Sequence, residues 1–319
     1  MEVNGYMWCG FGLVVIIMLV IDLGVFNRKA HVVEIKEALI WTAVWITLAL
    51  LFNYVIYLFM GKEKALEYLA GYLIEKSLSV DNLFVFIMLF GYFNVDPKYQ
   101  HEVLFWGIIG ALIMRAIFIF TGVALIEKFH WLIFLFGGFL VYTGITMLKP
   151  QKTDIDPDKN PLVRLFTRFF PVTPDMHGGK FFVKINKKLF ATPLFIALLV
   201  IEFSDVIFAV DSIPAIFGVS KDVFIIFTSN VFAILGLRSL YFALAGMTKY
   251  FYYLKYGLAA ILSFVGIKMI ISEYFKIPIF TSLLVIFGVL IISIVASMIF
   301  PQKETIPERM PLEPSDNED

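Results

Sequence analysis

Nine apolar stretches, each about 20 residues long, cover most of the 319-residue chain. A helix rises about 1.5 Å per residue, so about 20 apolar residues cross the roughly 30 Å hydrocarbon core of a bilayer. Strands of a membrane barrel would instead alternate between apolar and polar residues over about ten positions. The pattern predicts an all-α polytopic membrane protein with about nine transmembrane helices, near 7–26, 38–60, 66–93, 102–124, 131–148, 191–217, 223–246, 254–273 and 279–300.

The composition agrees with this class and narrows the chemistry. Hydrophobic residues make up 60% of the chain and charged residues 16%, far from the average of soluble domains. The one cysteine, Cys9, excludes an internal disulfide and a site made of several thiolates. The four histidines lie at the ends of the apolar stretches or between them, which disfavours a metalloenzyme built on clustered histidines. We therefore expect the lipid bilayer as a partner, and no enzyme activity, bound cofactor or nucleic-acid partner.

Lysine and arginine residues between the stretches predict the orientation of the chain. With the N-terminus outside, seventeen basic residues fall on the cytoplasmic side and five on the opposite side. This excess favours N-out and C-in. Nine of the seventeen lie at 149–190, which we expect to be a cytoplasmic loop with a short surface helix near 162–170 and a hairpin at 181–190. One transmembrane domain would span 1–300, and the tail at 301–319, rich in Pro, Glu and Asp, is predicted to be disordered and cytoplasmic.

Five carboxylates lie inside two of the apolar stretches, where acids are least expected. They are Glu75 and Asp81 in one stretch, and Glu202, Asp205 and Asp211 in another. An acid near the bilayer centre is unfavourable by roughly 2.5–3.5 kcal/mol on insertion scales. Several acids together therefore indicate an aqueous cavity, a bound cation or proton transfer, and this points to ion transport.

The two acidic stretches also belong to an internal repeat. Three segments match in order, 75–82 with 205–212, Arg115 with Arg238, and 144–147 with 266–269, at offsets of 130, 123 and 122. Each copy contains three helices, an odd number, so the second copy must cross the membrane in the opposite sense. The sequence thus predicts a 3+3 inverted repeat, an arrangement characteristic of secondary transporters with a substrate site near the midplane.

This repeat organises the predicted transmembrane domain. Two leading helices at 7–60 precede repeat 1 at 66–148, and a final helix at 279–300 follows repeat 2 at 191–273. Chance similarity between short apolar patterns is the alternative reading of any single match. Three matches in the same order favour the repeat.

The residues around the acids favour a hard divalent cation. Pro214 has no amide hydrogen to donate to Val210, so it predicts a kink and a free carbonyl oxygen beside Asp211. On a regular helix Glu75 and Asp81 lie about 120° apart, so both face one ion only if that helix unwinds locally. Carboxylate, amide, hydroxyl and backbone oxygens suit Mn²⁺, Mg²⁺ or Ca²⁺, whereas Zn²⁺ and Cu⁺ recruit imidazole or sulfur.

Four basic residues inside the stretches are predicted to compensate part of the acid charge, namely Lys76, Arg115, Arg238 and Lys268. The alternative is that the acids and bases form buried ion pairs that only fix helix packing. That alternative stays open for the acids and is favoured for Arg115, Arg238 and Lys268. Lys76 could reach toward the interface or pair with Glu75.

Two motifs resemble the signatures of the TerC family, and of its Alx-like bacterial branch in particular. They read GYLIEKSLSVDN at 71–82 and IEFSDVIFAVDSIPAIF at 201–217. The segments 228–238 and 254–257 resemble further parts of the family, and the resemblance runs from about 8 to 300. It implies a lysine-exporter-like inverted-repeat transporter, associated in this branch with manganese export. By motif position it implies that the ion is served by Glu75, Asp81, Asn82, Glu202, Asp205 and Asp211, with Ser77, Ser212 and Asn230 as helpers.

These observations lead to one main hypothesis and two alternatives. The main hypothesis is Mn²⁺ efflux across the bacterial cytoplasmic membrane by alternating access, with Mn²⁺ as substrate and protons as a candidate counter-ion. The first alternative is an exchanger of another hard cation, Ca²⁺ or Mg²⁺. The second is a membrane scaffold or sensor in the response to metal or tellurite stress, in which the buried acids are structural. The sequence leaves the coupling ion, metal selectivity, regulation and oligomeric state open.

Overall fold

A computed structural model describes residues 5–26, 34–93, 95–129, 131–148, 161–173, 177–185, 187–245, 253–272 and 274–300. Only the backbone is described at 22–26, 81, 92, 161, 162, 164, 169, 210 and 211. The helices are α1 (Gly5–Phe26), α2 (Ile35–Met60), α3 (Lys62–Tyr92), α4 (Pro97–Lys128), α5 (Leu132–Met147), α6 (Pro161–Phe169), α7 (Pro193–Phe217), α8 (Val223–Leu235), α9 (Leu237–Ala245), α10 (Leu254–Ile271) and α11 (Ile279–Ile299). The strands are β1 (Phe182–Ile185) and β2 (Lys188–Ala191).

The helices have the length and composition of membrane spans. Within the described residues, five are long and apolar enough to cross a bilayer, namely α2, α4, α7, α10 and α11. α8 and α9 pass the same test as a pair that bends by 42° at a break. α1 and α5 contain shorter apolar segments. The prediction of a helical membrane protein is confirmed, and the count of nine spans stays a prediction.

The stretch predicted at 223–246 is therefore not one straight helix. Gly236 separates α8 from α9, and a Cβ added there would lie 2.9 Å from both Lys76 Nζ and Trp45 Cβ. The glycine lets the side chains of α2 and α3 approach the bent backbone closely. Sequence hydrophobicity alone carries no signal for this bend, because both halves are apolar.

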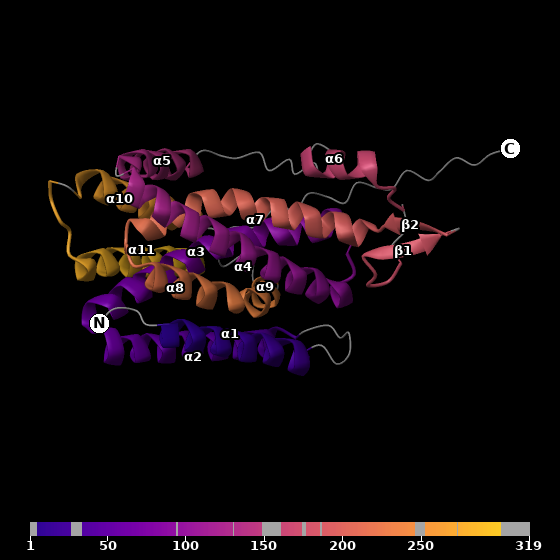
Figure 1. Ribbon diagram of the computed structural model, residues 1–319, viewed down its shortest axis with the longest axis horizontal. Coiled ribbons are helices and arrows are strands. Elements are labelled where there is room, and N and C mark those ends of the chain that lie inside the picture. Colours follow the sequence, from indigo (N-terminus) through magenta and orange to yellow (C-terminus); the bar gives the residue numbers. More distant parts are fainter. Residues whose placement is uncertain are drawn as a thin grey trace.

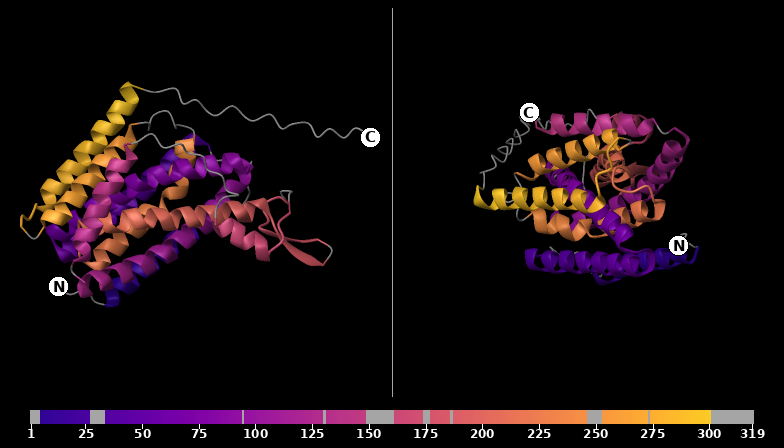
Figure 2. Two further views of the ribbon diagram at one scale, coloured as in Figure 1. Left: turned by 90° about the horizontal axis from the view of Figure 1, so that it is seen from above. Right: turned by 90° about the vertical axis from the view of Figure 1, so that its left-hand side faces the viewer.

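The helices enclose two connected cores. α1 and α2 lie side by side as a layer along one side of the bundle (Figures 1 and 2). Between this layer and the helices α3 and α8 lies a smaller core that contains Phe11, Trp45, Tyr68 and Phe232. The larger core draws its buried residues mainly from α3, α4 and α7 to α10. The predicted site residues lie on helices that face this larger core.

The helices that correspond in the predicted repeat run in opposite directions. On α3, Gly71 lies near Ile216 at the end of α7, whereas Phe86 borders the same cavity as Ile201 from earlier in α7. α3 and α7 are therefore antiparallel. An inverted repeat requires this relation between its equivalent helices.

α5 and α10 meet through small residues in two matching contacts. A Cβ added at Gly137 would lie 2.8 Å from the carbonyl oxygen of Gly266. One added at Gly144 would lie 2.7 Å from the carbonyl oxygen of Ala259. Moving each residue to its equivalent at an offset of 122 turns one contact into the other. Such reciprocal contacts are expected across a two-fold axis, and they support the inverted repeat, which stays a prediction.

The connection predicted at 149–190 contains regular structure. The expected short helix is α6, and the expected hairpin is formed by β1 and β2, which pair antiparallel from Phe182 with Ala191 to Ile185 with Lys188. The hairpin extends from one end of the bundle (Figures 1 and 2). The segment 149–160 and the tail 301–319 lie outside the described residues, so their predicted locations stay predictions.

Candidate functional site

The two acidic helices are continuous. α3 runs without interruption through Glu75 and Asp81, and α7 continues past Pro214 to Phe217. The local unwinding that would turn Glu75 and Asp81 toward one ion is therefore absent from α3, and these residues lie about 120° apart around it. The side chains of Asp81 and Asp211 are outside the described part of the structure, so their predicted roles stay predictions.

Arg115, on α4, joins residues from three other helices. Its Nη1 atom forms an ion pair with Glu75 Oε2 on α3. The same atom donates to Asn230 Oδ1 on α8 at 2.6 Å and to Ser212 Oγ on α7 at 3.1 Å. All four side chains are buried, with Arg115 4% exposed and Glu75 fully enclosed. A charged cluster thus lies where helices of both predicted repeats meet.

Neighbouring polar residues on α3 differ in whether they contact Glu75. Ser79 Oγ donates to Glu75 Oε1 at 3.3 Å, which adds a contact that the predicted ligand set did not include. Ser77 Oγ donates instead to the carbonyl oxygen of Leu73 in its own helix, at 2.6 Å. Asn82 is buried further along α3. Of these residues, only Ser79 joins the Glu75 carboxylate directly.

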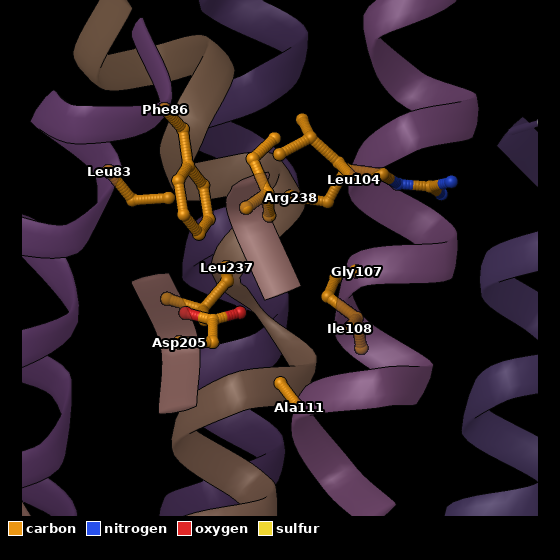
Figure 3. Close-up of a pocket in the computed structure, with 10 residues that line it drawn as sticks. Leu83, Phe86, Leu104, Gly107, Ile108, Ala111, Asp205, Leu237 and Arg238 are labelled. Atoms are coloured by element: carbon orange, nitrogen blue, oxygen red, sulfur yellow. The ribbon is translucent and has the colours of Figure 1, made fainter. Parts of the chain in front are cut away.

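Asp205 lies beside a small cavity between α3, α4, α7 and α9. The cavity is lined by Leu83, Phe86, Leu104, Gly107, Ile108, Ala111, Ile201, Asp205, Leu237 and Arg238. Figure 3 shows the Asp205 carboxylate and the Arg238 guanidinium on different sides of it. Asp205 is close enough to Arg115 and Glu75 to interact electrostatically with both. Asp205 therefore links a mostly apolar cavity to the charges of the Arg115 cluster.

Glu202 packs against the backbone of α4. A Cβ added at Gly110 would lie 2.1 Å from both carboxylate oxygens of Glu202, so this packing requires glycine. Glu202 also interacts electrostatically with Asp205, which follows it on α7. Among the acids with described side chains, Asp205 thus interacts electrostatically with both Glu202 and Glu75, and Glu75 forms the ion pair with Arg115.

The predicted charge-compensating residues make different contacts. Lys76 Nζ donates to the carbonyl oxygen of Ala233 on α8 at 3.1 Å and also interacts electrostatically with Glu75, whose ion pair is with Arg115. Lys268 on α10 interacts electrostatically with Glu67, which is not one of the five acids. Arg238 is buried beside the Asp205 cavity. Within the described residues, Arg115 thus forms an ion pair with a predicted ligand, Glu75.

Across the described part of the chain, no three His, Cys, Asp or Glu side chains come together as a metal-binding group. The oxygen atoms that do converge come from one carboxylate, one hydroxyl and one amide, those of Glu75, Ser212 and Asn230. Oxygen ligands of these types fit Mn²⁺, Mg²⁺ or Ca²⁺ and not softer metals. The donor set thus fits a hard cation.

A second polar network, which the sequence analysis missed, lies at the start of α3. Glu67 Oε2 accepts from Lys64 Nζ at 2.9 Å and from Ser220 Oγ at 2.5 Å. Lys64 also lies 3.6 Å from Asp222, whose side chain caps α8 by accepting from Phe224 N at 3.0 Å. Burial lowers the pKa of Lys64, but the hydrogen bonds and charges of Glu67 and Asp222 outweigh it and raise the pKa overall.

This network ties the start of α3 to the connection between α7 and α8. An aspartate directly before an apolar helix is a capping signal, so the role of Asp222 was available from the sequence. The contact with Glu67 was not, because Ser220 lies 153 residues away along the chain.

Comparison with known proteins places these features in a family. Residues 60–305 match the model of the integral membrane protein TerC family. The chain is 54% identical over 293 residues to the uncharacterised membrane protein STKORF319 of Myxococcus xanthus, covering 92% of each chain. It is 49% identical over 298 residues to the "Putative membrane-bound redox modulator Alx" of Salmonella typhi, covering 91% of this chain and 92% of the relative. The Escherichia coli K12 protein of the same name is 48% identical, with coverage of 91% and 93%. No solved structure matches.

Proposed function

Because the chain belongs to the TerC family of multi-pass integral membrane proteins, and because it gathers oxygen ligands inside the helix bundle, we propose that it transports a hard divalent cation. The proposed direction is export of Mn²⁺ from the cytoplasm across the bacterial inner membrane. The proposed orientation keeps the N-terminus outside and the C-terminus in the cytoplasm, as the distribution of basic residues predicts.

The observation that carries this proposal is the buried cluster of oxygen atoms around a positive charge. Glu75, Ser212 and Asn230 come from three helices and all direct an oxygen at the Arg115 guanidinium. Buried charges in a membrane protein are rare and usually mark an ion or proton pathway. A site that already stabilises one cation in the bilayer interior has the chemistry to bind another.

The position of the cluster supports alternating access. Glu75 and Arg115 belong to the first predicted repeat, and Ser212 and Asn230 belong to the second. Movement of one repeat against the other would change the distances between these groups, and so the affinity for the ion. Carboxylates must lose protons to bind a metal, so protons moving in the opposite direction are a natural counter-ion.

The scaffold alternative assigns the same ion pair to helix packing. It predicts that a folded variant lacking the Glu75 charge behaves normally toward metals. The name of the Salmonella and E. coli relatives raises redox modulation as another role. With Cys9 as its single cysteine, one chain offers no pair of thiols for an internal dithiol–disulfide couple.

Cellular manganese content tests the proposal. The protein would be expressed in bacteria that lack their own Mn²⁺ exporter, and the metal content of washed cells would be measured by mass spectrometry. We expect the wild type to lower cell Mn²⁺ and Glu75→Gln to leave it high. Glu63→Gln, which alters an exposed acid in the first turn of α3, is the matched control and should behave as the wild type. Equal manganese content with wild type, Glu75→Gln and empty vector would contradict export.

A further inference from the structure

The Arg115 cluster has an unusual geometry for an arginine ion pair. Among the described residues, its three oxygen partners all contact a single nitrogen, Nη1: Glu75 Oε2, Ser212 Oγ and Asn230 Oδ1. An Nη1 atom carries only a pair of hydrogens, so it cannot donate a separate bond to each oxygen. Arginine normally meets a carboxylate through its planar fork, with parallel hydrogen bonds from different nitrogens.

Of the three oxygen partners of Nη1, one lacks a well-aligned hydrogen bond. The contacts with Ser212 and Asn230 have hydrogen-bond geometry. Glu75 Oε2, in contrast, is buried and accepts no well-aligned hydrogen bond from the described residues, although it lies against Nη1. Three oxygens from three helices therefore converge on one point of positive charge, and only those of Ser212 and Asn230 follow its N–H directions. Oxygen ligands surround a metal ion in this way.

We propose that the Arg115 guanidinium is a tethered cation that fills the metal site while no metal is bound, and that Mn²⁺ displaces it. This inference rests on the proposed function, because it assigns Glu75, Ser212 and Asn230 to the transported ion. It goes beyond that function by giving the site a resident competitor. The Arg115 guanidinium and Mn²⁺ then bind alternately to the same three oxygen atoms.

Displacement follows from charge. A divalent ion and a guanidinium a few ångström apart repel each other strongly in a low-dielectric interior. Asp205 offers the guanidinium a second carboxylate partner, because it interacts electrostatically with Arg115. Rotation of the Arg115 side chain toward Asp205 would exchange one carboxylate partner for another.

The Arg115 guanidinium would neutralise the Glu75 carboxylate in the carrier without a bound metal. After Mn²⁺ leaves, an unpaired Glu75 carboxylate would remain buried, and a buried charge without a partner is strongly unfavourable. Arg115 restores the pair, so the carrier can return without a metal. Net export requires this return step, whereas exchange of one Mn²⁺ for another across the membrane does not.

The test compares binding, net export and exchange in Arg115→Gln. Binding of Mn²⁺ to purified protein is followed through the electron paramagnetic resonance signal of the free ion. We expect Arg115→Gln to bind Mn²⁺ about tenfold more tightly than the wild type, because the competitor is gone. Net efflux from loaded vesicles should fall at least about tenfold, while isotope exchange of Mn²⁺ is retained. Lys98→Gln, which removes an exposed basic residue in the first turn of the same helix, is the matched control and should leave all three measurements unchanged.

The outcomes separate this inference from the proposed function. Unchanged or weaker binding by Arg115→Gln, or equal loss of net efflux and exchange, would overturn the tethered-cation role while wild-type transport stands. If the wild type binds and moves no Mn²⁺, the proposed function itself fails. Where Arg115→Gln does not fold, Arg115→Lys reports in its place. Lysine keeps the positive charge, but its side chain is shorter and competes less well for the three oxygen atoms. Arg115→Lys should therefore bind Mn²⁺ more tightly than the wild type, and unchanged or weaker binding would overturn the inference.

Discussion

Neutralising Glu75 should destabilise the fold far more than neutralising Glu75 and Arg115 together. Both side chains are buried, with Arg115 4% exposed and Glu75 0% exposed, so Glu75→Gln leaves an uncompensated charge inside the bundle. Removing one partner of such a pair costs about 3–5 kcal/mol. Ser212 and Asn230 remain as acceptors for Arg115 and keep the expected loss near about 3 kcal/mol. At about 2–4 °C per kcal/mol, the melting temperature should fall by roughly 6–12 °C.

The double variant Glu75→Gln/Arg115→Gln removes both charges. Replacing a buried ion pair by neutral groups is often close to neutral in stability, so the double variant should lose less than about 2 kcal/mol. The assay is thermal unfolding of purified protein in detergent, followed by tryptophan fluorescence for the wild type, both single variants and the double variant. The interaction energy comes from the double-mutant cycle. A loss below about 1 kcal/mol for Glu75→Gln, or strictly additive losses, would refute the buried pair.

Three further predictions follow from other contacts. Gly137→Leu should lower the melting temperature, because even a Cβ there would lie 2.8 Å from the Gly266 carbonyl oxygen. The control Gly138→Leu should not lower it, because no atom lies within 4 Å of a Cβ added at Gly138. Equal melting temperatures of the two variants would contradict the α5–α10 contact. Gly110→Ala should fold but lose most Mn²⁺ flux in vesicles, because the new Cβ displaces the Glu202 carboxylate, and wild-type flux would show that its placement is unimportant. Because the folded pKa of Lys64 is raised above 10.5, its contribution to stability is fully present below the unfolded pKa and is lost as pH rises through the folded value. The excess stability of the wild type over Lys64→Gln in urea should therefore shrink above about pH 10.4, and a pH-independent excess would contradict this ion pair.

The helical architecture could be predicted because it depends on length and hydrophobicity. α2, α4, α7, α10 and α11 each carry enough consecutive apolar residues to be recognised as candidate spans. The hairpin of β1 and β2 and the short helix α6 were also predictable, because their patterns are local. The bend between α8 and α9 was missed, since it depends on what packs against Gly236.

The partners of the acids could not be predicted from the sequence. Lys76 follows Glu75 directly, but consecutive residues on a helix point about 100° apart, and Lys76 reaches Ala233 instead. The partner of Glu75 is Arg115, forty positions away, and the contact exists only because α3 and α4 pack around residues of α7 and α8. The residue types thus indicated an ion site, whereas tertiary packing decides which basic residue pairs with which acid.

The most direct test of the central claim is Mn²⁺ flux in proteoliposomes that contain the purified protein and an internal metal-sensitive dye. Imposed pH gradients of both signs would be used, with Mg²⁺, Ca²⁺ and Zn²⁺ as competitors and folded Asp205→Asn and Glu63→Gln as paired variants. The account predicts Mn²⁺ flux for the wild type and Glu63→Gln, inhibition by Mg²⁺ or Ca²⁺ more than by Zn²⁺, and loss of flux in Asp205→Asn. No protein-dependent flux under any gradient, or full flux in Asp205→Asn, would contradict it.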